Sequence, residues 1–281
     1  MRLTCVVDDN SGVEDPDRSI AKASGGFLSE HGLSLLVETD RGKKVLMDTG
    51  SSERAFLHNL DLLGLRPKDL DMVFISHGHY DHLGGLPALL REGVPCYTHP
   101  STFLGRRFIE TSGRLREIGP SEGLLALLRD NPPTYDDRPR ELVPGVSTTG
   151  EVQRSTSFEV PSSFVIERDG HRTPDLIMEE QALCVSTKKG IVVLTGCGHA
   201  GIVNILSQVR RRSDRKIAMV AGGFHLWRAA PDMLLRSIDG VKRFNVEKVA
   251  PMHCTGFAAT KAFSDRFPGF ELLGTGCHME L

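Results

Sequence analysis

The sequence lacks the features that would place it in a membrane. No apolar stretch approaches the roughly 20 residues that a membrane-spanning helix needs. The first residues run straight into a strand-like segment, without the pattern of a signal peptide. We therefore expect a cytoplasmic protein that has no membrane partner.

Neither sign of charge dominates, and no disulfide pattern is present. The chain has 34 basic and 36 acidic residues, and its short basic run at 210–212 is more simply the solvated end of a helix. Because a nucleic-acid-binding protein usually carries a basic face, we expect no nucleic-acid partner. The six cysteines are scattered without a framework spacing, which predicts free thiols in a reducing compartment.

The remaining composition is that of an ordinary globular protein. Hydrophobic residues make up 40% and charged residues 25% of the 281 residues, so neither disorder nor a fibrous repeat is indicated. A chain of this length buries roughly three quarters of its unfolded surface. A full hydrophobic core is therefore available.

Strand-like and helix-like segments alternate along the chain. Apolar, β-rich runs predict strands at 3–7, 33–38, 72–76, 182–187, 218–221 and 248–251, and helical patterns fit 54–63, 83–91, 201–211 and 233–244. Two more runs, VLMDTG at 45–50 and IVVLTGCG at 191–198, look like strands that deliver polar residues at their tips. The stretch 130–150 holds four prolines and is either a surface excursion or the seam between two halves. We predict one α/β domain over 1–281, with pseudo-symmetric halves that meet near 130–150.

One loop gathers four side chains of the kinds that bind metals. In the segment 71–86, DMVFISHGHYDHLGGL, an apolar strand leads directly into His77, His79, Asp81 and His82, and a Gly-Gly turn then opens a helix. Imidazole nitrogens and carboxylate oxygens suit zinc, iron or manganese. A strand-to-helix turn also lets near neighbours point into one space. The pattern predicts a transition-metal site.

The segment SHGHYDHLGGL resembles the signature of the metallo-β-lactamase superfamily, and the other signals of that superfamily follow in order. Asp48 in LMDTG matches its first aspartate motif, and His199 in TGCGHAGIVNIL and His253 in PMHCTG stand where later metal-binding motifs are expected. Together, HGLSLLVE, GCGHAGIVN, GGFHL and HCTG resemble the branch that includes dihydropterin-ribofuranosylaminobenzene phosphate synthases.

The resemblance implies an αββα sandwich with metals at the edge between its two sheets. His77 and His79 would bind a first divalent transition-metal ion, and Asp81 and His82 would bind a second one, which His253 would complete. Zinc is the expected metal, with manganese or iron as alternatives. Asp48 would be either a distant ligand or a carboxylate that fixes a ligand imidazole.

The chain departs from the superfamily pattern at two points. The usual Gly-His-Thr-Pro-Gly turn is absent, and its distorted echo places His171 in the charged stretch ERDGHRTPD. We therefore expect His171 to be exposed and His199 to supply the missing imidazole. In many relatives an aspartate bridges the two metals at the position of Cys197, which is here either a candidate ligand or a buried packing residue. For Cys254, next to His253, we favour a structural role.

Other residues are candidates for contact with a substrate. His225 in AGGFHLW follows a short apolar strand, and we expect it to contact substrate, with metal ligation as the alternative. The backbone amides of Gly222 and Gly223 would help to hold an anionic group. His31 begins a strand and lies either at the cleft or on a surface turn.

These residues favour an enzyme, with Asp81 and His225 as its catalytic residues. We expect a hydrolase or transferase that acts on an anionic small molecule, such as a phosphate ester, a diphosphate or a pterin-like compound, through a metal-activated water or oxygen. The alternatives are a non-catalytic metal- or ligand-binding sensor and a nuclease of the same superfamily. The sequence leaves the oligomeric state open.

Overall fold

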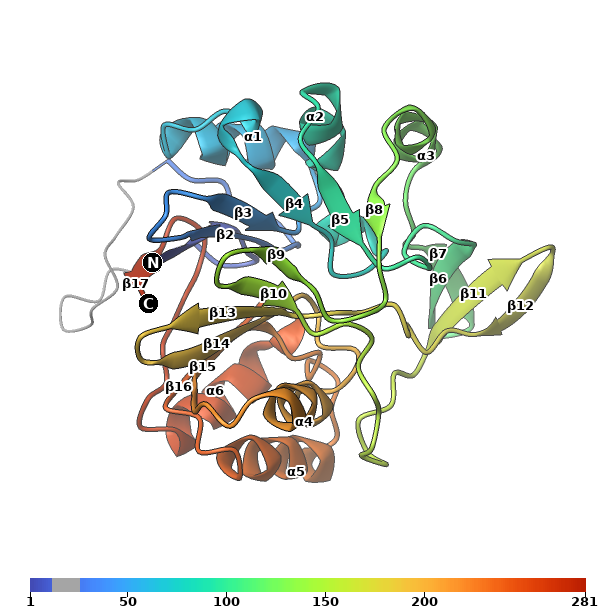
Figure 1. Ribbon diagram of the computed structural model, residues 1–281. Helices are drawn as coiled ribbons and strands as arrows, with labels where there is room; N and C mark the ends of the chain where they lie inside the picture. The colour runs from blue at the N-terminus through green and yellow to red at the C-terminus, as the bar shows by residue number, and fades with distance from the viewer. Residues whose placement is uncertain (12–25) are drawn as a thin grey trace.

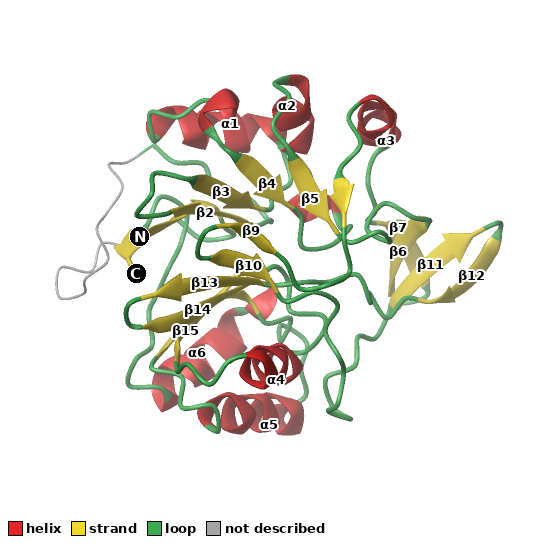
Figure 2. Ribbon diagram, in the orientation of Figure 1, coloured by secondary structure: helices red, strands yellow, loops and turns green. Residues whose placement is uncertain are grey.

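Two β-sheets lie face to face in the computed structural model, which describes residues 1–11 and 26–281, and helices cover the outer face of each sheet (Figure 1, Figure 2). The order of layers is therefore α, β, β, α. The apolar side chains of both inner faces form a common core, because residues from strands of both sheets share one buried cluster.

The first sheet has seven strands and carries three helices on its outer face (Figure 1). In spatial order its strands are β17 (His278–Glu280), β1 (Arg2–Val7), β2 (Ser34–Glu38), β3 (Lys44–Met47), β4 (Met72–Phe74), β5 (Cys96–Thr98) and β8 (Thr134–Tyr135). The helices are α1 (Glu53–Leu62), α2 (Leu86–Arg91) and α3 (Glu122–Asp130). Their apolar residues and those of the sheet's outer face form a second buried cluster.

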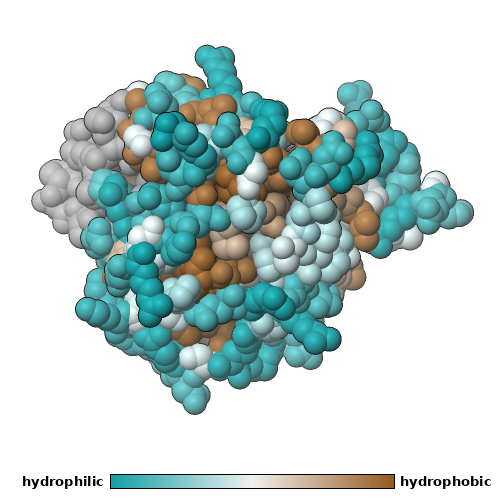
Figure 3. Space-filling view, turned by 45° about the horizontal axis from the view of Figure 1, so that its top comes forward, coloured by the Kyte–Doolittle hydropathy of each residue, from teal (hydrophilic) through white to brown (hydrophobic). Residues whose placement is uncertain are grey.

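The second sheet has six strands and is covered in the same way. Its spatial order is β16 (Lys248–Met252), β15 (Ile217–Gly223), β14 (Gly190–Thr195), β13 (Leu183–Thr187), β10 (Val146–Thr148) and β9 (Glu141–Val143). The helices that cover it are α4 (Ile202–Arg212), α5 (Pro231–Lys242) and α6 (Phe257–Arg266). The opposite faces of these helices are polar, and hydrophilic residues cover much of the surface seen in Figure 3.

The chain passes from the first sheet to the second within the proline-rich stretch 130–150. The strand β8 lies at the edge of the first sheet, whereas β9 and β10 belong to the second. The last strand, β17, returns to the first sheet and pairs with β1. Among the described residues, no helix has the length and apolarity that a membrane crossing requires.

A third, smaller sheet projects from one side of the sandwich (Figure 1). It has four strands in the order β12 (His171–Pro174), β11 (Phe164–Arg168), β6 (Arg106–Thr111) and β7 (Arg114–Glu117). This sheet was not predicted from the sequence. Strands β7 and β12 are exposed along their whole length and rich in charge, so they lack the apolar alternation that marks a strand.

The predicted strands and helices are present, with shifts of one to three residues at their ends. The largest shift is at α2, which begins at Leu86 rather than at 83 because the chain first forms a 3-10 turn at Tyr80–His82 and then the Gly-Gly turn. Both glycines lie against α1 and its cap. A Cβ on Gly84 would lie 2.1 Å from the Ser51 carbonyl carbon, and one on Gly85 would lie 2.3 Å from the Phe56 ring. The Gly-Gly turn thus permits the close packing that fixes the histidine loop.

Candidate metal centre

The candidate site lies where the carboxyl ends of several strands meet. Strands β3 and β4 are parallel, as are β14, β15 and β16. Strand β1 points the same way as β3, because each pairs antiparallel with β2. Loops that follow these strands therefore gather at one edge of the sandwich. They carry all the predicted metal ligands.

Three imidazoles form the first donor cluster, which we define as His77, His79 and His199. Nδ1 of His79 lies 3.1 Å from Nε2 of His77 and 3.2 Å from Nε2 of His199. In a tetrahedral zinc site with bonds of about 2.0 to 2.1 Å, the edges between donor atoms measure about 3.4 Å. Burial lowers the pKa of each imidazole well below its ordinary value, which favours the neutral form that binds metals. This cluster therefore fits a transition metal in size and in protonation.

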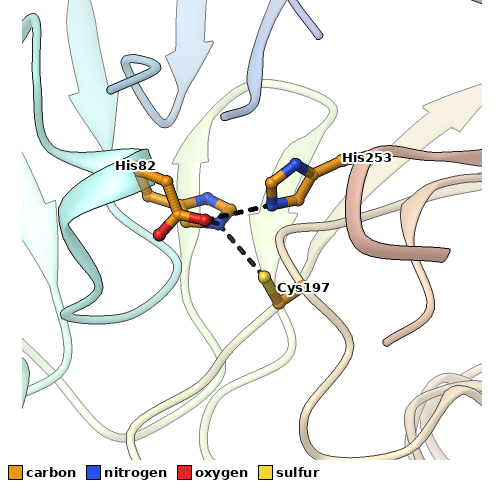
Figure 4. Close-up of side chains that lie close together, drawn as sticks. His82, Cys197 and His253 are labelled. Carbon is orange, nitrogen blue, oxygen red and sulfur yellow. Dashed lines mark hydrogen bonds and ion pairs between the residues drawn. The ribbon is translucent and has the colours of Figure 1, made fainter. Parts of the chain in front are cut away.

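The second donor cluster comprises Asp81, His82, Cys197 and His253, whose ligand atoms lie within 4.8 Å of one another. Nε2 of His82 is 3.2 Å from Sγ of Cys197, and Nε2 of His253 is 3.4 Å from Oδ2 of Asp81. Figure 4 shows His82, Cys197 and His253 converging from three separate segments. Nε2 of His253 is buried and has no hydrogen-bond partner among the described residues 1–11 and 26–281. A metal ion would satisfy this atom.

The two clusters are neighbours but differ in protonation. The rings of His77 and His82 are 4.3 Å apart, centroid to centroid. Burial lowers the pKa of His82, but Asp48 and Asp81 outweigh it and raise that pKa. At His253, burial is likewise outweighed, by Cys254, Asp81 and Asp9, and the pKa is raised well above its ordinary value. Protons therefore compete with a metal more strongly at these two imidazoles than at those of the first cluster.

A carboxylate fixes each imidazole of the second cluster. Oδ2 of Asp48 lies 2.7 Å from Nδ1 of His82, and Oδ1 of Asp9 lies 2.6 Å from Nδ1 of His253. With Nδ1 donating to a carboxylate, each ring turns Nε2 toward the cluster. Asp48 also accepts hydrogen bonds from the backbone N–H and the hydroxyl of Ser76. This geometry suits an orienting role for Asp48, but Asp48 also forms a candidate donor group with His77 and His82, so both roles stay predictions.

The acidic residues that hold these loops were not predicted from the sequence. Asp8 accepts a hydrogen bond from the His253 backbone, and Asp9 contacts the ring of the same residue. The signal was present, because VVDDN places two aspartates after an apolar strand, just as LMDTG does. The buried carboxylate of Glu180 accepts from the amides of Gly198 and Ala200 at 2.7 and 2.6 Å, on either side of His199. No local pattern marks Glu180.

Three residues of the site have a strained backbone. Asp48, His225 and His253 have φ angles of 58°, 47° and 48°. Residues other than glycine adopt this left-handed conformation rarely, and it costs of order 1–3 kcal/mol. Each of these residues lies just beyond the end of a strand, where the chain must turn sharply and still present its side chain to the site.

Five residues of the two clusters line a cavity of about 400 Å³, a size typical of small-molecule sites. Its lining includes His79, Asp81, Cys197, His199, His225 and His253. The small third sheet forms one wall, with Phe164 and Ile109 contributing apolar surface. The site therefore combines a buried polar floor with an apolar side.

The structure brings most of the predicted site residues together. His199 joins the first cluster. His171 instead lies exposed on β12, opposite Arg168 in the register of β11 and β12. Cys197 joins the second cluster. The thiol of Cys254, for which we favoured a structural role, donates to the Cys197 carbonyl oxygen at 3.2 Å. It also forms a further candidate donor group with Cys197 and His225.

Two of the candidates for substrate contact, His225 and His31, line the cavity. The ring of His225 lies 4.2 Å from that of His199 and lines the cavity. His31 lines it too, with Nε2 at 3.3 Å from Oδ2 of Asp81 and Nδ1 at 2.8 Å from Oδ2 of Asp9. Both therefore lie at the site.

Gly222 and Gly223 are not among the residues that line the cavity, so this geometry does not support the expectation that their amides hold a substrate anion, which stays a prediction. Both glycines are buried in β15, and the Gly223 amide donates to the Gly196 carbonyl at 2.9 Å. A Cβ on Gly222 would lie 2.1 Å from the backbone carbonyl oxygen of Thr195. Their small size instead lets β15 approach β14 closely.

Comparison with known proteins decides the family. The sequence profile described as the metallo-beta-lactamase superfamily matches residues 30–171. The chain belongs to the metallo-β-lactamase superfamily. It is 30% identical to the 7,8-dihydropterin-6-methyl-4-(beta-D-ribofuranosyl)-aminobenzene-5'-phosphate synthase of Methanocaldococcus jannaschii, over 98% of this chain and 95% of that protein.

Solved structures agree with this assignment. Tm1679, described as a metal-dependent hydrolase of the beta-lactamase superfamily, superimposes with a TM-score of 0.82 and 33% identity over 100% of this chain and 99% of that one. Zn²⁺-bound PqqB from Methylobacterium extorquens gives a TM-score of 0.54 at 14% identity, over 100% of each chain, a likeness that shows the fold alone. The superfamily and the αββα sandwich predicted from the sequence are confirmed.

Proposed function

We propose that this protein is a binuclear metal-dependent enzyme, a hydrolase or transferase, whose substrate is an anionic small molecule. One observation carries the proposal: two adjoining donor clusters, one of three neutral imidazoles and one of mixed ligands, open into the same cavity. Zinc suits this nitrogen, oxygen and sulfur donor set best, with manganese or iron as alternatives. The substrate classes that we favour are phosphate esters, diphosphates and pterin-like compounds.

Bound metals would supply a nucleophilic oxygen at neutral pH and would stabilise negative charge on the reacting group. The residues of the chain have separate tasks around that chemistry. Asp81 offers Oδ2 to the second cluster and lies within 3.4 Å of both His31 and His253, so it ties three loops to one point. His225 lies beside His199, and its buried Nδ1 has no hydrogen-bond partner in the part of the chain that the structure describes. This unpartnered nitrogen at the cavity supports a role for His225 in binding and orienting a substrate oxygen.

The relatives support both reaction types. The Methanocaldococcus jannaschii relative is named a synthase of a pterin-containing phosphate compound, and the Tm1679 structure is described as a hydrolase. An anionic substrate fits both descriptions, since cationic metals favour it. The similarity to the synthase extends over nearly the whole of both chains, which is why pterin-like compounds are among the substrates to be tested.

The test of this function is a substrate screen with metal-loaded protein. Phosphomonoesters, phosphodiesters, diphosphates, thioesters and lactones are assayed first, and then a pterin diphosphate with an arylamine acceptor. We expect turnover of at least one anionic substrate, its loss with a chelator and its recovery when metal is restored. A sensor or binding protein would take up metal and ligand but convert none of these compounds, and that result would reject the enzyme proposal.

The variant His225→Ala separates substrate contact from metal binding. If His225 orients substrate, the variant keeps its metal content but loses roughly one to three orders of magnitude in kcat/KM. The exposed His171→Ala is the matched control and should change neither quantity. Loss of metal from His225→Ala would make this residue a ligand, and unchanged kinetics would remove it from the site.

A further inference from the structure

We propose that Arg116 and Arg228 form an anion-binding subsite at the mouth of the cavity, which recognises a phosphate or carboxylate group carried by a ring-containing substrate. The proposal rests on the proposed function in one respect, because it adds a second recognition point to the same cavity. The arginines would bind one group of the substrate, while a different group reacts at the metal clusters.

The residues that line the cavity are buried at its floor and exposed at its mouth. The side chains of the metal clusters that line the floor are buried, for example His199 at 3% exposure. Phe164 is also buried, whereas Trp227 is 46% exposed. Arg116 and Arg228 are exposed and line the same cavity. The two guanidinium groups therefore lie where a substrate enters.

Each guanidinium stacks on an aromatic ring that lines the cavity. Cζ of Arg228 lies 4.1 Å from the ring centroid of Trp227, and Cζ of Arg116 lies 5.5 Å from that of Tyr80. Arg116 also donates to the Tyr80 hydroxyl at 3.3 Å. Stacking holds the plane of a guanidinium and leaves edge N–H donors free to bind a carboxylate or phosphate. Both arginines are thus preorganised for an anion.

Neither arginine has a carboxylate partner among residues 1–11 and 26–281. The contrast within the third sheet is informative. Arg106 and Arg172 both stack on Phe108, yet Arg106 pairs with Glu117 at 2.7 Å and Arg172 with Glu167 at 2.7 Å. Arg116, on the neighbouring strand, faces the cavity with its charge unpaired.

The acidic residues of the cavity do not neutralise these charges. Asp9 and Asp81 are its two acidic lining residues, and both contact the histidines: Asp9 lies 2.6 Å from His253 and Asp81 lies 3.3 Å from His31. The mouth therefore stays cationic. A ring that enters it meets Phe164 and Trp227 as apolar surface, while its anionic substituent meets the arginines.

The test uses the fluorescence of Trp227, the single tryptophan of the chain, on which Arg228 stacks. Phenylphosphonate, benzoate and the neutral benzyl alcohol are titrated at low ionic strength into the protein as purified, with its metal content measured. Isothermal titration calorimetry determines the same dissociation constants. It therefore detects binding even if the fluorescence of Trp227 does not change. The first two probes distinguish a phosphate-type from a carboxylate-type ligand.

We expect an anionic probe to bind, benzyl alcohol to bind far more weakly, and added salt to weaken the anion. Arg116→Gln and Arg228→Gln should each raise the dissociation constant of that anion by about ten-fold, the effect of losing a charge-assisted hydrogen bond. Arg172→Gln, stacked but ion-paired and outside the cavity, should leave it unchanged. Metal content should be equal in all of them.

Equal binding of benzyl alcohol, or unchanged dissociation constants in both cavity variants, would overturn the subsite. Its failure is distinguishable from failure of the proposed function. An enzyme that turns over an anionic substrate with wild-type kinetics in both arginine variants has the function without the subsite. Arginine-dependent anion binding without turnover of any substrate has the subsite without the function.

Discussion

The two donor clusters differ in their residue types and in what prepares their side chains to bind a metal. The first cluster is uniform: three buried imidazoles whose pKa values burial lowers. The second is mixed and backed by carboxylates, with Asp48 behind His82 and Asp9 behind His253. In the first, burial is the main cause of the lowered pKa values, and neighbouring cationic groups add to it. In the second, charge and orientation prepare them, and protons compete with the metal.

The largest expected effect comes from breaking the first cluster. His199→Ala removes one of three imidazoles, so we expect loss of one metal equivalent and a fall in turnover of at least about 1,000-fold, since nucleophile activation and charge stabilisation both depend on the ions. Elemental analysis and kinetics measure the two effects. His171→Ala is the control. If that variant lost metal and His199→Ala kept it, His171 rather than His199 would be the ligand.

A smaller effect is expected from the thiol of the second cluster. Burial raises the pKa of Cys197, and a metal would have to displace its proton. Cys197→Ser should keep one full equivalent of metal at the first cluster and bind the second more weakly. The cobalt form of the wild type should show a thiolate-to-metal absorption band that this variant lacks, and Cys184→Ser is a control. Loss of both ions would mean that Cys197 holds the whole centre.

The carboxylates behind the imidazoles should matter less than the ligands themselves. Asp48→Asn and Asp9→Asn should each lower the affinity of the second cluster by roughly 10- to 100-fold. Asp48→Asn should be the more severe, because Asp48 also binds the backbone and hydroxyl of Ser76, next to His77. Competition titration with a chromophoric chelator gives the affinities. Equal loss at the first cluster in Asp9→Asn would contradict the separation of the two.

The smallest effect is a difference in pH dependence. The pKa values of His82 and His253 are raised, so these two rings become protonated at a higher pH than the rings of the first cluster do. As the pH falls through the slightly acidic range, the second cluster should therefore lose its metal first. Metal titrations at several pH values, on wild type and on His199→Ala, assign each loss. Release from the first cluster before the second would reverse the comparison.

The sequence predicted the layers and the ligand loops because both have local signals. Strands such as β14 and β15 are continuous apolar runs, and the histidines of 77–82 follow such a run directly. Asp8 and Asp9 had the same signal and were overlooked. The Gly222 and Gly223 amides were assigned to substrate because a glycine pair suggests access to a ligand. Here their small size serves the packing between strands instead.

Other features could not be predicted from local pattern. Strand β7 consists of Arg114, Leu115, Arg116 and Glu117, all exposed, and only its pairing with β6 makes it a strand. The contact between Arg116 and Tyr80 joins segments 36 residues apart, so the cationic mouth exists only in the folded chain. Glu180 likewise reaches the His199 loop across 18 to 20 residues.

The metal stoichiometry of the intact protein tests the central claim most directly. Protein freed of metal and then titrated with zinc or manganese should bind two equivalents per chain, as measured by elemental analysis after removal of free metal. His199→Ala and Asp81→Ala should each bind one. Anomalous scattering should then place one ion at each cluster of the wild type. Folded wild-type protein that has never met a chelator and takes up no transition metal would contradict the account.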